Sequence, residues 1–107
     1  MALSDFNQEL YLIITNEVDK KNASKLANLL LRDKLIPCVT FKNIESYFWW
    51  EGDIVQGKEV QLLIKCREEN VNKVIAKIKD CHGYDVPEII YFRVSANKKF
   101  NNWVNSI

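Results

Sequence analysis

The sequence has few of the residues that most often mark a catalytic or metal centre. Its 107 residues include one histidine, three scattered glycines and two prolines, so no glycine-rich phosphate loop is present. The three cysteines, an odd number, show no CxxC spacing and are typical of reduced thiols in a cytoplasmic protein. No nucleophile–base pair or cofactor motif is visible, and we therefore expect a protein that is not an enzyme.

Charge of one sign and long apolar runs are also missing. Fifteen basic and fourteen acidic residues leave a net charge of +1, without the basic excess that favours nucleic acid. The apolar runs are far shorter than a membrane span, and the N-terminus "MALSDFNQEL" does not resemble a signal peptide. With 48% hydrophobic and 27% charged residues, the chain is expected to form one globular domain over 1–107, with 1–8 as a flexible N-terminal arm.

Hydrophobic spacing predicts the order β-α-β-β-α-β, with a short helix appended. The expected strands are 9–15, 38–50, 59–67 and 87–94, and the expected helices are 23–35, 68–82 and 98–107. The stretch "VQGK" (55–58) is expected to form the hairpin turn, and Gly52 a bulge within a strand. Phe100, Trp103 and Val104 are expected to point inward. Right-handed crossovers then give an α+β, ferredoxin-like sandwich.

One strand carries more apolar surface than this sandwich can cover. In "IESYFWWEGDI" (44–54), four aromatic residues follow one another, whereas a strand with one wet face alternates apolar with polar residues. Two helices cover one face of the sheet, so such a patch on the other face predicts an interface. A base-stacking platform is not favoured, because "EVQLLIKCR" (59–67) lacks the pattern of RNA-recognition strands.

The only histidine lies in a group of possible metal donors. Cys81 precedes His82 and Glu88 follows six residues later, and all three side chains suit copper or zinc. Alternatively, His82 is a structural residue that interacts with the dipole at the end of a helix. Lys65 and Arg67 either meet an anion or are simply solvated. The residues alone leave these alternatives open.

Four stretches together resemble a known family. They are "ASKLANLLLRDKLIPCVTF", "SYFWWEGDI", "EVQLLIKCR" and "GYDVPEIIYF", followed by Trp103. In this order and at these intervals they are similar to the CutA family of divalent-cation tolerance proteins, over about residues 9–105. The resemblance implies a homotrimer in which the long second and third strands pair with a neighbouring subunit. Its architecture is that of the PII signalling trimers, which hold small ligands in clefts between subunits.

The resemblance also implies a function in tolerance to divalent metals, chiefly copper. His82 and Glu88 match the donors in the family's "HPYEVPE" block. Gly83 stands where the family usually has proline, Asp85 where it has glutamate, and Ile14 where some members have a cysteine donor. We therefore expect weak binding of copper or another divalent cation.

A second function is compatible with the same architecture. A PII-like signalling or interaction trimer would bind a small anion or a partner protein in its inter-subunit cleft, lined by Trp50, Lys65, Tyr84 and Glu88. The sequence indicates no particular protein partner.

Overall fold

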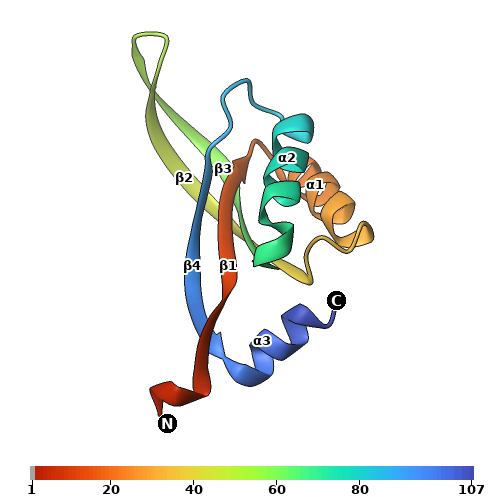
Figure 1. The fold of residues 1–107 in the computed structure, drawn as a ribbon. Coiled ribbons are helices and arrows are strands. Elements are labelled where there is room, and N and C mark those ends of the chain that lie inside the picture. Colours follow the sequence, from red (N-terminus) through yellow and green to blue (C-terminus); the bar gives the residue numbers. More distant parts are fainter. Residues whose placement is uncertain (1) are drawn as a thin grey trace.

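The computed structural model describes residues 2–107, and of Glu9 only the backbone (Figure 1). It confirms the predicted ferredoxin-like β-α-β-β-α-β order with an appended helix. The elements are β1 (Phe6–Glu17), α1 (Lys20–Arg32), β2 (Cys38–Trp50), β3 (Asp53–Arg67), α2 (Val71–Cys81), β4 (Ile89–Asn97) and α3 (Lys98–Asn105). Short 3-10 helices, Leu3–Asp5 and Glu68–Asn70, precede β1 and α2. Within residues 2–107, no helix combines the length and apolar character needed to cross a membrane.

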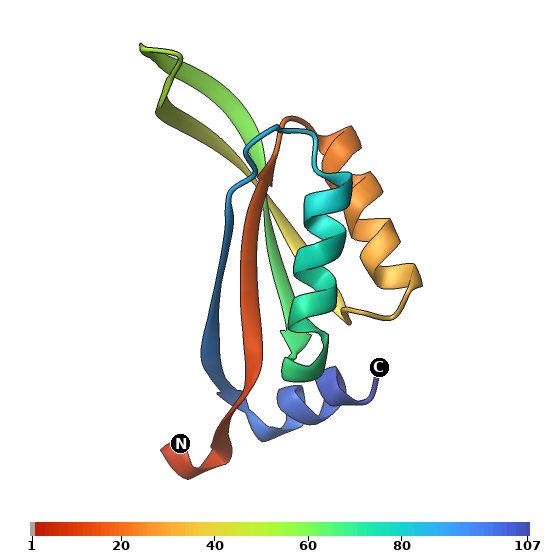
Figure 2. The same cartoon turned by 45° about the horizontal axis from the view of Figure 1, so that its top comes forward.

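The four strands form one antiparallel sheet in the order β2-β3-β1-β4. Helices α1 and α2 pack on one face of this sheet, and the β2–β3 hairpin projects beyond them (Figure 2). The core lies between the helices and the sheet. Its fully buried members include Ile13, Leu30, Leu62, Ile64 and Ile78.

The other side of the sheet, here called the open face, is also apolar. Side chains alternate along a strand, so Leu12 and Ile14 of β1 point away from Ile13 and the core. Ile14 lies between Leu63 of β3 and Ile90 of β4 in the strand register. Ile90 is 48% exposed, and no helix of residues 2–107 covers this side of the sheet in Figure 2.

The hairpin turn lies five residues earlier than predicted. Strands β2 and β3 pair without interruption from Cys38↔Lys65 to Trp50↔Asp53, which leaves only Glu51 and Gly52 as the loop. Their φ angles are +50° and +84°, and two positive φ values are what a type I′ hairpin requires. The predicted turn at 55–58 and the bulge at Gly52 are therefore wrong.

Several predicted boundaries also move. β1 begins at Phe6, so residues 6–8 of the expected arm belong to a strand, and Phe6 pairs with Asn97. α1 begins three residues earlier because the Asp19 side chain accepts a hydrogen bond from the Asn22 N–H at 2.8 Å, an N-cap. In α3, Val104 is buried as expected, whereas Trp103 is 44% exposed and does not point inward.

Candidate functional site

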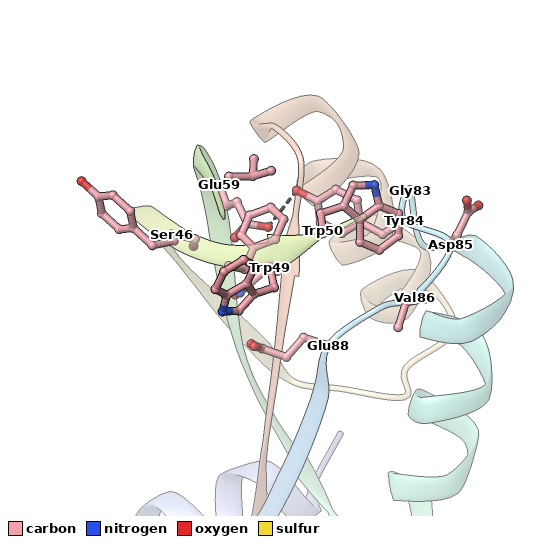
Figure 3. Close-up of a pocket in the computed structure, with 13 residues that line it drawn as sticks. Ser46, Trp49, Trp50, Glu59, Gly83, Tyr84, Asp85, Val86 and Glu88 are labelled. Atoms are coloured by element: carbon pink, nitrogen blue, oxygen red, sulfur yellow. Dashed lines mark hydrogen bonds between the residues drawn. The ribbon is translucent and has the colours of Figure 1, made fainter. Parts of the chain in front are cut away.

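A groove of about 810 Å³ lies where the projecting hairpin meets the segment between α2 and β4 (Figure 3). Residues 46–50, Val55 and Glu59 form its hairpin side. Residues 83–86 and Glu88 form the opposite side, and Asn16 of β1 contributes between them. This size is typical of small-molecule sites. The aromatic run thus forms one wall of the groove.

The groove is acidic. Glu59, Asp85 and Glu88 line it, and no lysine, arginine or histidine is among its lining residues within the part of the chain that the structure describes. The Tyr84 hydroxyl donates a hydrogen bond to Glu59 Oε2 at 2.7 Å, drawn in Figure 3. Burial, with added contributions from the Glu59 carboxylate, raises the pKa of Tyr84 well above its usual value. Tyr84 therefore stays a neutral donor and leaves the negative charge of the groove unchanged.

Asn16 brings a buried polar group to the groove wall. It is 9% exposed, and its amide oxygen has no hydrogen-bond partner among the residues described. Its neighbours Thr15 and Glu17 are fully buried on the helix side of β1, so alternation directs Asn16 to the other side. Buried polar groups without a partner are uncommon in folded proteins and call for an explanation.

His82 lies behind the groove wall in a closed set of hydrogen bonds. The Thr15 hydroxyl donates its one proton to the carbonyl oxygen of Glu88 at 2.6 Å. Its oxygen is 3.1 Å from His82 Nε2, which must then carry the proton and donate it. His82 Nδ1 accepts from the Tyr84 N–H at 3.1 Å. Both ring nitrogens are thus occupied, and the side chain is fully buried.

A buried carboxylate holds the same segment from the other side. Glu17 is 0% exposed, and its Oε1 accepts from the Gly83 N–H at 3.2 Å and lies 3.8 Å from His82 Nδ1. A Cβ atom on residue 83 would meet that oxygen at 3.0 Å. Glycine therefore allows the close approach and also provides the N–H donor. A proline at this position would have no N–H to donate.

The structure brings some of the predicted site residues together and separates others. Trp50, Tyr84 and Glu88 all line the groove. Lys65 does not: it pairs with Cys38 at the far end of the hairpin, and its Nζ donates to Thr40 Oγ1 at 3.1 Å.

The two predicted metal donors are linked only indirectly. His82 bonds to Thr15, and Thr15 bonds to the backbone oxygen of Glu88, whose side chain lines the groove. Within residues 2–107, no cluster of three or more histidine, cysteine, aspartate or glutamate side chains is placed to hold a metal ion.

Sequence reasoning missed Asn16 and Glu59 as groove residues. A signal for Asn16 was present, because it is a polar residue after the apolar run "LYLIIT" of a central strand. Glu59 carried no local signal, since sheet pairing alone brings it near Tyr84.

Comparison with known proteins establishes the family. The family model "CutA1 divalent ion tolerance protein" matches residues 11–107. The chain belongs to this family. It is 33% identical over 96 residues to the divalent-cation tolerance protein CutA of Pyrococcus horikoshii, covering 89% of this chain and 94% of that one. It is 34% identical over 96 residues to CutA of Pectobacterium atrosepticum, covering 88% and 87%.

Solved structures of CutA proteins have the same fold. Divalent ion tolerance protein CutA1 from Ehrlichia chaffeensis superposes with a TM-score of 0.88 at 34% identity, covering 92% of this chain and 94% of that one. CutA1 from Pyrococcus horikoshii gives a TM-score of 0.87 at 32% identity, with 90% and 95% covered. The resemblance to the CutA family and the ferredoxin-like class predicted from the sequence are confirmed.

Proposed function

We propose that this CutA chain acts in divalent-cation tolerance as a homotrimer, and that it has no catalytic activity of its own. The observation that supports a trimer most strongly is the open face, on which Leu12, Ile14 and Leu63 continue into the half-exposed Ile90 and Phe92. A contiguous apolar surface of this kind marks an interface in a soluble protein. The projecting hairpin adds Phe48 and Trp50 on the same side of the sheet, which are 41% and 46% exposed.

The first prediction concerns assembly. Light scattering of the purified protein at micromolar concentration should give about three times the 12.5 kDa mass of one chain. The physical reason is that three copies related by one rotation axis can bury three open faces against each other in a closed ring. The strands at the sheet edges, β2 and β4, would gain partners in the same step. A mass of one chain under these conditions would contradict the proposal.

For metal binding, we propose Glu88 as the main donor. Its side chain reaches the groove, whereas His82 can ligate only after giving up its hydrogen bond with the Tyr84 N–H or with Thr15. Carboxylate oxygen with few other protein ligands leaves most coordination positions to water, which makes binding weak. The general order of divalent affinities favours copper over zinc at such a site, without implying that copper is the physiological ion.

The second prediction tests Glu88. Calorimetric titration with copper should show weak uptake, which Glu88→Gln weakens roughly tenfold, corresponding to about 1.4 kcal/mol. Glu45→Gln is the matched control, because Glu45 is an exposed carboxylate on β2 that does not line the groove. Equal copper uptake by the wild type and both variants would show that the ion binds elsewhere.

The groove argues against the second candidate function, an anion-binding trimer. Its three carboxylates repel an anion, and Lys65, the predicted cation, lies at the other end of β3. Electrostatic complementarity therefore favours positively charged ligands at this site.

A cytoplasmic location is part of the same proposal. Cys38, Cys66 and Cys81 are unpaired thiols in the structure, which suits a reducing compartment. Relatives in rice and Archaeoglobus fulgidus are named chloroplastic and periplasmic, respectively. Location therefore has to be tested for this chain directly, for example by fractionation of cells that express it.

A further inference from the structure

Helix α1 carries an excess of positive charge that the overall net charge of +1 conceals. Residues 18–35, which form α1 and its flanks, include five basic residues and only two acidic ones. Both acidic residues are already engaged, because Asp19 caps the helix and Asp33 pairs with Lys77 of α2 at 3.7 Å. None of the five basic residues takes part in an ion pair with the side chains that the structure describes.

Three of these cations, Lys21, Lys25 and Arg32, lie in one row, here called the basic stripe. Their spacing of four and seven residues places them on the same face of the helix, and all three are exposed. The row is about 16 Å long at 1.5 Å per residue. Helix α1 packs on the side of the sheet opposite the open face (Figure 2), so burial of the open faces in a trimer does not cover the basic stripe.

A second observation concerns the cost of this arrangement to the helix itself. Lys20 and Lys21 stand in the first turn of α1, which contains no acidic residue, although the positive end of the helix dipole disfavours cations there. Lys21 and Lys25 are four positions apart, so their like charges repel each other. No acidic residue lies three or four positions from Lys25 or Arg32. Local sequence choices that oppose the fold are expected at functional sites, so this placement indicates an anionic ligand.

The helix layer also indicates which kind of anion fits. A single small anion cannot contact both ends of the basic stripe, whereas an extended chain of charges can follow it. Helices α1 and α2 contain no aromatic residue, so the bases of a single-stranded nucleic acid have no stacking surface. Helix α1 lies on the sheet beside α2 (Figure 1), unlike a recognition helix that enters the major groove of a duplex. Lysine acts as a point charge and favours a high density of negative charge, which a bare phosphate chain provides.

We propose that the basic stripe binds an extended, flexible chain of phosphate groups, of the inorganic polyphosphate class. Lys21, Lys25 and Arg32 contact phosphate groups along α1, and the exposed Lys20 and Lys34 extend the positive field at its two ends. Release of counterions from the phosphate chain drives the association, so binding depends strongly on salt. This interaction goes beyond the proposed metal-tolerance function, because it needs neither the groove, nor a metal ion, nor the open face.

The test is a titration of the intact, metal-free protein, in the assembly state that it has in solution, with medium-chain inorganic polyphosphate. Calorimetry at low salt should show saturable binding that weakens as the salt concentration rises. The double variant Lys25→Gln with Arg32→Gln should bind roughly tenfold more weakly, and its plot of log affinity against log salt should be less steep by roughly one to two. Both side chains are exposed and glutamine is a good helix former, so the fold should be unaffected.

The double variant Lys98→Gln with Lys99→Gln is the matched control. It removes the same charge from two exposed lysines in the first turn of α3, outside the basic stripe, and should leave the affinity within about twofold of the wild type. An equal loss of affinity in both double variants would refute the basic stripe, because it would show attraction to net charge alone. So would the absence of saturable binding up to about 1 mM polyphosphate at low salt.

Other anions test the class of the ligand. Orthophosphate, polyglutamate and duplex DNA should all bind more weakly than polyphosphate at the same concentration of charge. Equal or tighter binding of polyglutamate would overturn the proposal in favour of an acidic protein segment, and equal or tighter binding of DNA would overturn it in favour of a nucleic acid. A monomeric mass or a lack of copper uptake contradicts the proposed function alone, since the basic stripe is complete within one protomer.

Discussion

Trp50→Ala is expected to shift the protein from trimer towards monomer. Trp50 is 46% exposed in the single chain, at the end of the hairpin where the aromatic run continues the open face. Large aromatic side chains at the centre of an interface contribute much of its binding energy, and truncating one costs about 2–4 kcal/mol. Because each 1.4 kcal/mol is a factor of ten, the association constant should fall by roughly 30- to 1,000-fold.

Light scattering over a dilution series measures this shift, and Trp103→Ala provides the matched control. Trp103 is 44% exposed, almost the same fraction, but it lies on α3 and stacks against Phe100 with ring centroids 5.8 Å apart. In Figure 1, α3 lies at the opposite end of the sheet from the hairpin. The control should dissociate no more readily than the wild type. If the Trp50 variant stays trimeric at the lowest concentration and unfolds at the wild-type temperature, Trp50 does not anchor the interface.

Elements with a strong local period were predictable from the sequence. In α1, four of the six apolar residues at helical spacing are buried (Ala23, Leu26, Ala27 and Leu30). Leu31 is 38% exposed, and Leu35 lies beyond the end of the helix. The hairpin turn was not predictable in the same way. Glu51 adopts a positive φ that asparagine or glycine usually supplies, so its identity gave no turn signal. Gly57 did look like a turn residue, but it lies within β3 and pairs with Ser46.

The position of the turn also explains which of the predicted site residues lie together in the groove and which do not. Moving it to Glu51 and Gly52 lengthens β3 to 15 residues. At about 3.3 Å per residue, Lys65 then lies roughly 40 Å along the strand from Asp53, too far to share a groove with Trp50 in one protomer. Asn16 and Glu59 line the groove because the strands pair in the sheet and because the segment before β4 returns to the hairpin. These long-range contacts leave no mark on local sequence.

His82 shows how burial changes the interpretation of a residue that sequence alone leaves open. Its position at the end of α2 suggested a metal donor or a contact with the helix dipole. The side chain is instead fully buried between β1 and the segment that leads to β4. Each ring nitrogen has a partner, and through Thr15 the ring is connected to the backbone of Glu88. The histidine thus holds the groove wall in place.

His82→Ala is therefore expected to lower the free energy of unfolding by about 2–4 kcal/mol. The substitution leaves a cavity and removes the partners of the Tyr84 N–H and of Thr15, two groups that are at least partly shielded from water. Chemical denaturation measures this loss of stability. The protein concentration is fixed so that the contribution of assembly to stability stays constant. Thr15→Val removes only the bridging hydroxyl and should cost less, about 1–2 kcal/mol. Glu88→Gln changes only the groove-facing carboxylate and should leave stability nearly unchanged.

Copper calorimetry on the folded His82→Ala protein then separates a structural role from a ligating one. If the histidine only positions the groove wall, copper uptake per folded chain should fall by less than in Glu88→Gln, because the exposed carboxylate remains. A variant of unchanged stability that no longer takes up copper would show the opposite: His82 would then leave its hydrogen bonds to ligate the ion, as the family resemblance implies. The two measurements together distinguish these cases because loss of the network changes stability whether or not metal is present, whereas loss of a ligand changes stability only when metal is bound.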